Sequence, residues 1–298
     1  MEYREIANKE IRISRIAFGC MSLDPAAGDP TPLIQRAVDA GINLFDTADL
    51  YNRGENETML GKALGSRRKA VLVATKVGNQ WDPDSDGWRW NPRREYILRA
   101  ADDSLRRLGT DYIDLYQLHG GTLNDPYEEV IDAFDTLRQQ GKIRYYGISS
   151  IRPNVIRRFA AIPAVSTVMM QYSLLDRRPE ESCFDLLQTK GIGVLARGTV
   201  AGGWLTGKTP KAYLDHSAAT VAGAAAAVRA LAAAKETVPA AVAIGFAVAN
   251  PAVSSAVAGI RTEQQLSEAL RAIDISFTAE EYNTLQQAAP TLIYKEHR

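Results

Sequence analysis

The sequence predicts an α/β protein built as a closed (β/α)8 barrel, the TIM-barrel class. Short apolar runs recur along the chain, and each is followed by a turn and then by a segment with helical periodicity. Strict alternation of strands and helices implies that the strands pair in parallel. Eight such units within 298 residues fit a closed barrel, and an open doubly wound sheet is the main structural alternative.

Each expected element follows from a local pattern. The expected strands are the apolar runs at residues 16–18, 44–46, 71–75, 113–118, 145–148, 167–171, 193–196 and 253–258. The clearest expected helices are the amphipathic stretches at residues 32–40, 57–64, 92–108 and 128–140. Gly41, Gly109 and Gly141 stand where helices should end, because glycine accepts the left-handed backbone at a helix C-terminus.

Three segments do not fit the strand–helix repeat. Residues 1–13 are expected to form an N-terminal β-hairpin around Asn8 and Lys9 that covers the barrel floor. Residues 78–91 are expected to form a long loop that carries three tryptophans. Residues 209–234 are rich in alanine and end in a helix, so the barrel should carry an extra helix in its C-terminal part.

The composition is that of an ordinary globular protein and excludes several classes. Hydrophobic residues make up 46% of the chain, and 35 Lys and Arg balance 35 Asp and Glu. A net charge of zero gives no electrostatic reason to expect nucleic acid or a membrane surface as a partner. Cys20 and Cys183 are far apart, so neither a disulfide nor a metal site is expected. Without a signal-like or membrane-spanning stretch, residues 1–298 are expected to form one cytoplasmic domain, whose oligomeric state stays open.

Ionisable residues stand at the ends of three consecutive expected strands. The active site of a (β/α)8 barrel lies at the C-terminal ends of its strands. Asp46 ends the second strand and Tyr51 follows in its loop, Lys76 follows the third strand, and His119 follows the fourth. Singly, each has a structural explanation, such as a turn cap, a surface lysine or a core histidine. The combination on neighbouring strands indicates a catalytic group.

The chemistry of this group suits proton donation to a carbonyl oxygen. A buried lysine retains its charge when a carboxylate such as Asp46 lies beside it. A lysine cation near a tyrosine hydroxyl favours the phenolate form, which makes Tyr51 a usable proton donor near neutral pH. His119 can donate a hydrogen bond to the same carbonyl. Such a group can protonate an alkoxide that forms while a hydride arrives from a cofactor.

Longer segments around these residues resemble the signature blocks of the aldo-keto reductase superfamily. In chain order they are LFDTADLY (44–51), ATKVG (74–78), LYQLH (115–119), GISS (147–150), MQYSLL (170–175), GWLTGK (203–208) and GIRTEQQL (259–266). The resemblance covers roughly residues 1–290 in the family's order. It implies NADPH-dependent reduction of aldehydes and ketones, with Asp46, Tyr51, Lys76 and His119 as the catalytic residues and Tyr51 as the acid.

The resemblance also implies a cofactor site. Its residues are Ser149, Ser150, Gln171 and Arg197 at the nicotinamide, Gly203, Leu205, Gly207 and Lys208 over the pyrophosphate, and Gly259, Arg261, Thr262 and Gln265 at the adenosine end. NADPH is expected rather than NADH, because the guanidinium of Arg261 suits a ribose phosphate. Three positions depart from the family pattern: Ser150 and Ala269 each replace a common asparagine, and Arg197 replaces an aromatic residue.

The sequence gives only a general indication of the substrate. An apolar or aromatic wall around a small carbonyl compound is expected from Met21, Trp204 and the three tryptophans of residues 78–91, which are Trp81, Trp88 and Trp90. The alternative is a tryptophan loop that is held by its own packing. Residues 201–219 carry few large apolar anchors besides Trp204 and Leu205, so cofactor binding is expected to order this segment.

Three other functions have some support in the sequence. Residues 202–209 match the pattern of a phosphate-binding P-loop, but Pro210 makes the required helix start poor. Lys76 would be the covalent residue of a Schiff-base aldolase, which leaves Tyr51 unexplained. A regulatory subunit similar to potassium-channel β-subunits would keep the cofactor site without turnover.

Overall fold

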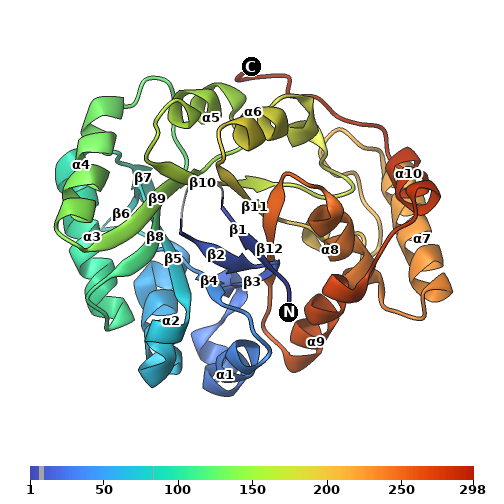
Figure 1. Cartoon of the computed structure of the whole chain (residues 1–298), viewed down its shortest axis with the longest axis horizontal. Helices are drawn as coiled ribbons and strands as arrows, with labels where there is room; N and C mark the ends of the chain where they lie inside the picture. Colours follow the sequence, from blue (N-terminus) through green and yellow to red (C-terminus); the bar gives the residue numbers. More distant parts are fainter. Residues whose placement is uncertain (7–9, 83) are drawn as a thin grey trace.

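Eight parallel strands close into a barrel in the computed structural model, which describes residues 1–6, 10–82 and 84–298 (Figure 1). They are β3 (Ile16–Gly19), β4 (Leu44–Asp46), β5 (Leu72–Val77), β8 (Ile113–Leu118), β9 (Ile143–Ser149), β10 (Val165–Gln171), β11 (Gly193–Arg197) and β12 (Val253–Gly259). All the expected strands are confirmed, with small shifts at their ends. Pairing of β12 with β3 closes the sheet and excludes the open doubly wound alternative.

A helix follows each barrel strand and covers the outside of the barrel (Figure 1). These helices are α1 (Thr31–Asp39), α2 (Glu55–Leu64), α3 (Arg94–Leu108), α4 (Tyr127–Gln139), α5 (Pro153–Ala160), α6 (Cys183–Thr189), α8 (Pro239–Ala249) and α9 (Glu263–Arg271). Gly41, Gly109 and Gly141 follow the ends of α1, α3 and α4 with φ of 87°, 61° and 72°, as expected for helix C-termini.

Two additional helices, α7 (Ala218–Ala234) and α10 (Ala279–Gln287), pack against each other, and α7 also packs against α8. Nearly every residue of α8 is buried, which explains its continuous apolar sequence. Among the described helices, none alone is long and apolar enough to cross a membrane. Only the pair α7 and α8, bent by 101° relative to each other, meets that criterion of length and composition together.

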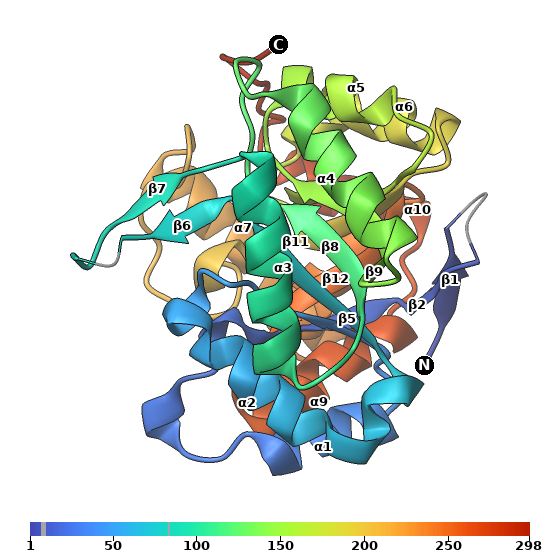
Figure 2. The same ribbon diagram turned by 90° about the vertical axis from the view of Figure 1, so that its left-hand side faces the viewer.

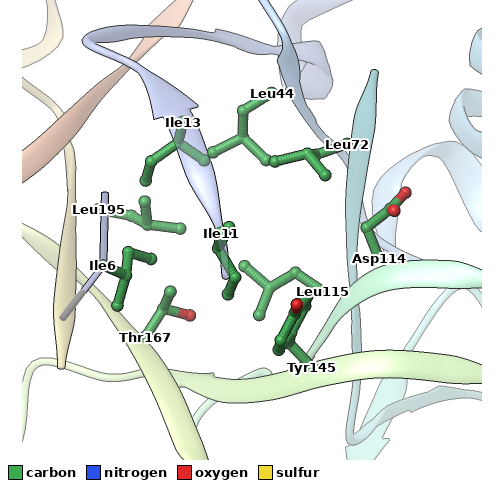
Figure 3. Close-up of a pocket in the computed structure, with 10 residues that line it drawn as sticks. All are labelled: Ile6, Ile11, Ile13, Leu44, Leu72, Asp114, Leu115, Tyr145, Thr167 and Leu195. Atoms are coloured by element: carbon green, nitrogen blue, oxygen red, sulfur yellow. The ribbon is translucent and has the colours of Figure 1, made fainter. Parts of the chain in front are cut away.

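An N-terminal hairpin covers the barrel floor, as the sequence predicts. Strands β1 (Tyr3–Glu5) and β2 (Arg12–Ser14) pair in antiparallel fashion. Figure 3 shows Ile6, Ile11 and Ile13 facing the inward side chains of the barrel strands. These isoleucines are buried with Leu44, Leu115 and Leu195 in one apolar cluster, and the partly buried Leu72 packs against it. The predicted turn at Asn8 and Lys9 lies outside the described residues.

The prediction of a loop at residues 78–91 is wrong in part, because this segment contains a second hairpin. Strands β6 (Asn79–Trp81) and β7 (Trp88–Trp90) pair in antiparallel fashion. They lie at the end of the barrel opposite to β1 and β2 (Figure 2). Tryptophan favours strands, and each strand carries tryptophan. Because the first hairpin covers the barrel floor, this second hairpin lies over the C-terminal ends of the barrel strands.

Candidate active site

The four expected catalytic residues meet at the C-terminal ends of β4, β5 and β8. The Nζ atom of Lys76 donates a hydrogen bond to Asp46 Oδ2 at 2.8 Å and lies 3.4 Å from the Tyr51 hydroxyl oxygen. It also donates to the carbonyl oxygen of Thr47 at 2.6 Å. The rings of Tyr51 and His119 pack edge to face, with their centroids 5.9 Å apart. The predicted group is therefore assembled around a completely buried lysine.

Electrostatics keeps Lys76 positively charged and His119 neutral at pH 7. Burial alone opposes the ammonium, but Asp46 and Tyr51 raise the pKa of Lys76 above its ordinary value, so Lys76 stays protonated at neutral pH. Burial, reinforced by Lys76 and Arg197, lowers the pKa of His119 to about 3. A neutral imidazole carries one N–H donor and one acceptor. His119 can therefore donate one hydrogen bond to a ligand without adding charge.

A left-handed turn fixes the backbone that follows Tyr51. Asn52, Arg53 and Gly54 have φ of 47°, 53° and 88°. Positive φ is unfavourable for residues other than glycine, so the surroundings must hold this turn. The side-chain amide of Asn52 donates to the Leu23 carbonyl at 3.2 Å. A Cβ atom at Gly54 would lie 2.5 Å from Arg107 Nε, so a larger residue there would have to displace the Arg107 side chain.

Buried polar contacts attach the Tyr51 segment to the helices outside the barrel. Glu57, at the start of α2, is fully buried and accepts a hydrogen bond from Arg107 Nε of α3 at 2.7 Å. Its other oxygen accepts from the Thr75 hydroxyl at 2.5 Å. Burial and the nearby Glu57 raise the pKa of Asp49 to about 8, and its Oδ2 lies 3.3 Å from the Tyr96 hydroxyl. Sequence analysis did not identify these contacts, because the partners are far apart in the chain.

The residues expected at a nicotinamide lie at the same end of the barrel as Lys76. Ser149 ends β9, and Ser150 follows it with its hydroxyl bonded to the Arg152 amide at 3.2 Å. Gln171 ends β10 beside Arg197, which ends β11. The Arg197 guanidinium donates to Gln171 Oε1 at 3.2 Å. These strand ends form one continuous polar rim next to the expected catalytic residues.

A cavity of about 120 Å³ lies between β12, α8, α9 and the loop that follows β11. It contains two of the residues expected to bind the cofactor, Gly259 and Gln265, whereas Arg261 is exposed outside it. The Thr262 hydroxyl caps α9 by accepting the Gln265 amide hydrogen at 3.2 Å. The cavity is also lined by Thr206, from the loop expected over the pyrophosphate, and by two polar residues that sequence analysis did not identify, Thr199 and Glu268.

The glycine-rich segment after β11 is a turn rather than a P-loop. Gly203 and Gly207 have φ of 95° and 125°. Leu205 is fully buried, so its side chain faces the core and only its backbone is available to a ligand. The Lys208 ammonium lies 5.7 Å from the centre of the Trp204 ring. The next helix begins at Ala218, so no helix opens at Lys208 as a P-loop requires.

The segment that leads to α7 has two anchors that the sequence did not reveal. His216 is only 4% exposed, and its Nε2 lies 3.0 Å from the Leu175 carbonyl oxygen. Tyr213 is partly buried and accepts a hydrogen bond from Gln171. The expectation of few large anchors in this segment therefore holds only for its first half.

The aromatic residues expected at the substrate lie in different environments. Trp81 donates to the Leu50 carbonyl at 3.2 Å, and Arg53 stacks on its ring at 4.7 Å. Met21 and Trp88 are exposed by 67% and 53%. Trp90 lies against Gly78, where an added Cβ atom would come within 2.5 Å of the Trp90 ring. Through Trp81, the hairpin thus contacts the segment that carries Tyr51.

Comparisons with known proteins point to one family. The model of the aldo/keto reductase family matches residues 15–290. The chain is 42% identical to the uncharacterized oxidoreductase YqkF of Bacillus subtilis, with 100% of both chains covered. It is 35% identical to yakc of Schizosaccharomyces pombe, an aldo-keto reductase named for NADP(+), over 68% of this chain and 62% of that protein.

Similar solved structures are also those of aldo-keto reductases. The holo form of aldo-keto reductase AKR11C1 from Bacillus halodurans matches with a TM-score of 0.92 and 41% identity, covering 100% of this chain and 99% of that one. The apo form of the same protein matches with a TM-score of 0.84 and 38% identity over the same shares of the two chains. The similarity therefore extends over the whole barrel.

Proposed function

Because the chain belongs to the aldo-keto reductase family, we propose that it reduces aldehyde and ketone carbonyls to alcohols with NADPH. The observation that carries this proposal is the position of the Lys76 ammonium, within hydrogen-bonding distance of both Asp46 and Tyr51. A fixed cation beside a tyrosine hydroxyl stabilises the phenolate that remains after proton transfer. Tyr51 is therefore the general acid.

Each member of the group has a separate role. NADPH, when bound, supplies a hydride to the carbonyl carbon. The Tyr51 hydroxyl donates its proton to the carbonyl oxygen, and Lys76 stabilises the resulting phenolate. Asp46 keeps Lys76 protonated in its buried position. The N–H group of neutral His119 donates a hydrogen bond that orients the carbonyl.

The residues at the barrel mouth fit a phosphorylated nicotinamide dinucleotide. Ser149, Ser150, Gln171 and Arg197 would hold the nicotinamide end, because they line the rim beside the catalytic group. The cavity at the start of α9 would take part of the adenosine end. Arg261 is exposed next to this cavity, and its guanidinium would bind the 2′-phosphate.

The contacts of Lys76 argue against the Schiff-base alternative. A covalent lysine must present a neutral amine to its substrate. Lys76 is fully buried, donates to two oxygen acceptors and is held protonated by Asp46. These contacts support a role as a fixed cation rather than as a nucleophile.

The proposed function is tested by following NADPH oxidation with a panel of small aldehydes and ketones. Apolar and aromatic aldehydes are expected to react best, because Met21, Trp81, Trp88 and Trp204 would line the substrate side. A protein that binds NADPH but oxidises it with no carbonyl compound would refute the enzymatic proposal. That result would favour a regulatory subunit instead.

A further inference from the structure

Tyr213 holds the side-chain amide of Gln171 in one orientation. Gln171 Nε2 donates to the Tyr213 hydroxyl oxygen at 2.9 Å, and Gln171 Oε1 accepts from Arg197 Nη1 at 3.2 Å. A guanidinium can only donate hydrogen bonds. The amide oxygen of Gln171 must therefore face Arg197, and its nitrogen must face Tyr213.

This orientation leaves a defined pair of groups for a ligand. A glutamine amide has two N–H donors and an oxygen with two lone pairs. One donor is used by Tyr213 and one lone pair by Arg197. One donor and one lone pair of Gln171 remain, which is the pattern that a carboxamide complements. The nicotinamide ring carries such a carboxamide.

Tyr213 is itself fixed by the turn that contains it. The backbone amides of Tyr213 and His216 donate to each other's carbonyl oxygens at 3.1 and 3.0 Å. The buried His216 ring is hydrogen-bonded to the carbonyl of Leu175. Leu175 lies in the loop that follows Gln171 at the end of β10. The Tyr213 ring packs against the hydrophobic core. The Tyr213 hydroxyl that contacts Gln171 is therefore held in place by its surroundings.

We propose that Tyr213 is a positioning residue of the cofactor site, an inference that rests on the proposed function. It orients Gln171 so that the remaining amide groups meet the carboxamide of the nicotinamide. Tyr213 acts only through Gln171, at the end of β10. Its influence is consequently confined to the nicotinamide end, and the adenosine end, held beside α9, is independent of it.

The test compares two nucleotides that differ only at the nicotinamide end. Affinities for NADPH and for 2′-phosphoadenosine diphosphoribose, which lacks nicotinamide, are measured by quenching of tryptophan fluorescence. Tyr213→Phe should weaken NADPH binding by about 2- to 12-fold, the range for loss of one neutral hydrogen bond. Binding of the truncated nucleotide should not change. Tyr127→Phe is the matched control, since the Tyr127 hydroxyl donates to the Arg158 carbonyl at 2.8 Å on the outside of the barrel.

The possible outcomes separate this inference from its premise. Equal weakening of both nucleotides would mean that Tyr213 only stabilises the loop, and it would overturn the inference. NADPH affinity that is unchanged or tighter in Tyr213→Phe would also overturn it, because Tyr213 would then be dispensable or would compete with the cofactor. If the wild-type protein binds neither nucleotide, the proposed function itself fails. An equal melting temperature for the two variants confirms that folding is not the cause.

Discussion

Replacing Asp46 with asparagine leaves the buried Lys76 ammonium without its counter-charge. The Lys76 side chain is fully buried, that of Asp46 is 5% exposed, and their charged atoms are 2.8 Å apart. Removal of one member of a buried pair costs about 3–5 kcal/mol of folding free energy. Lys76 keeps its bond to the Thr47 carbonyl at 2.6 Å, so we expect the lower end, about 3 kcal/mol.

Guanidinium unfolding at pH 7 measures this loss as a change in the free energy of unfolding. The control is the double variant Asp46→Asn with Lys76→Met, which removes both charges and keeps a side chain of similar length. Because no unpaired charge remains, the double variant should be more stable than Asp46→Asn alone. A single variant within about 0.5 kcal/mol of wild type, the range of ordinary surface substitutions, would refute the reasoning.

The pH dependence gives a second check on the same pair. In the wild type, Asp46 and Tyr51 raise the pKa of Lys76, so its contribution is complete below pH 10.5, the ordinary lysine value, and is lost as pH rises through the raised value. In Asp46→Asn, burial without a carboxylate should place the folded pKa of Lys76 below that of the unfolded chain. The variant then gains stability as pH rises above 7. The difference in unfolding free energy between wild type and variant should become smaller as pH rises. A difference that grows with pH would contradict the charge assigned to Lys76.

Three further predictions follow from the site. Tyr51→Phe removes the proton donor but little volume, so turnover should fall by roughly 10²–10⁴-fold with NADPH affinity unchanged; near-normal turnover would reject Tyr51 as the acid. The pKa of His119 falls from 6.5 to about 3 on folding, so the unfolded chain binds its proton more readily. The free energy of unfolding should therefore decrease as pH falls from about 6.5 to 3. In His119→Asn, denaturation measured over the same pH range should show a weaker decrease. Arg261→Ala should weaken NADPH binding relative to NADH by roughly 10-fold, and an unchanged ratio of the two dissociation constants would remove Arg261 from the phosphate site.

The barrel could be predicted from the sequence because its strands and helices carry strong local patterns. Strands that are buried on both faces appear as short continuous apolar runs, and β8 and β10 are buried along nearly all their length. Gly109 ends α3 with a positive φ that few other residues adopt. The β6–β7 hairpin was missed because Trp88 is exposed, so no alternation of buried and exposed residues marks its second strand.

The proximity of the four residues proposed as catalytic could also be predicted, but the contacts that hold them could not. Asp46, Lys76 and His119 interrupt apolar sequence at strand ends, so each is visible along the chain. The pairs Arg107 with Glu57 and Tyr213 with Gln171 are separated by 50 and 42 residues. Their contact depends on how α3 packs on α2 and how the segment before α7 folds back over β10. No local pattern encodes that packing.

The unsatisfied groups at the barrel mouth are a physical reason to expect ligands there. Asp46 Oδ1 and His119 Nδ1 are buried without a hydrogen-bond partner in the described part of the chain. Each unpaired buried polar atom costs about 1–3 kcal/mol, and a left-handed residue such as Asn52 costs a similar amount. A folded protein keeps such costs only where the rest of the structure enforces them. A bound ligand that pairs with the free atoms would offset these costs.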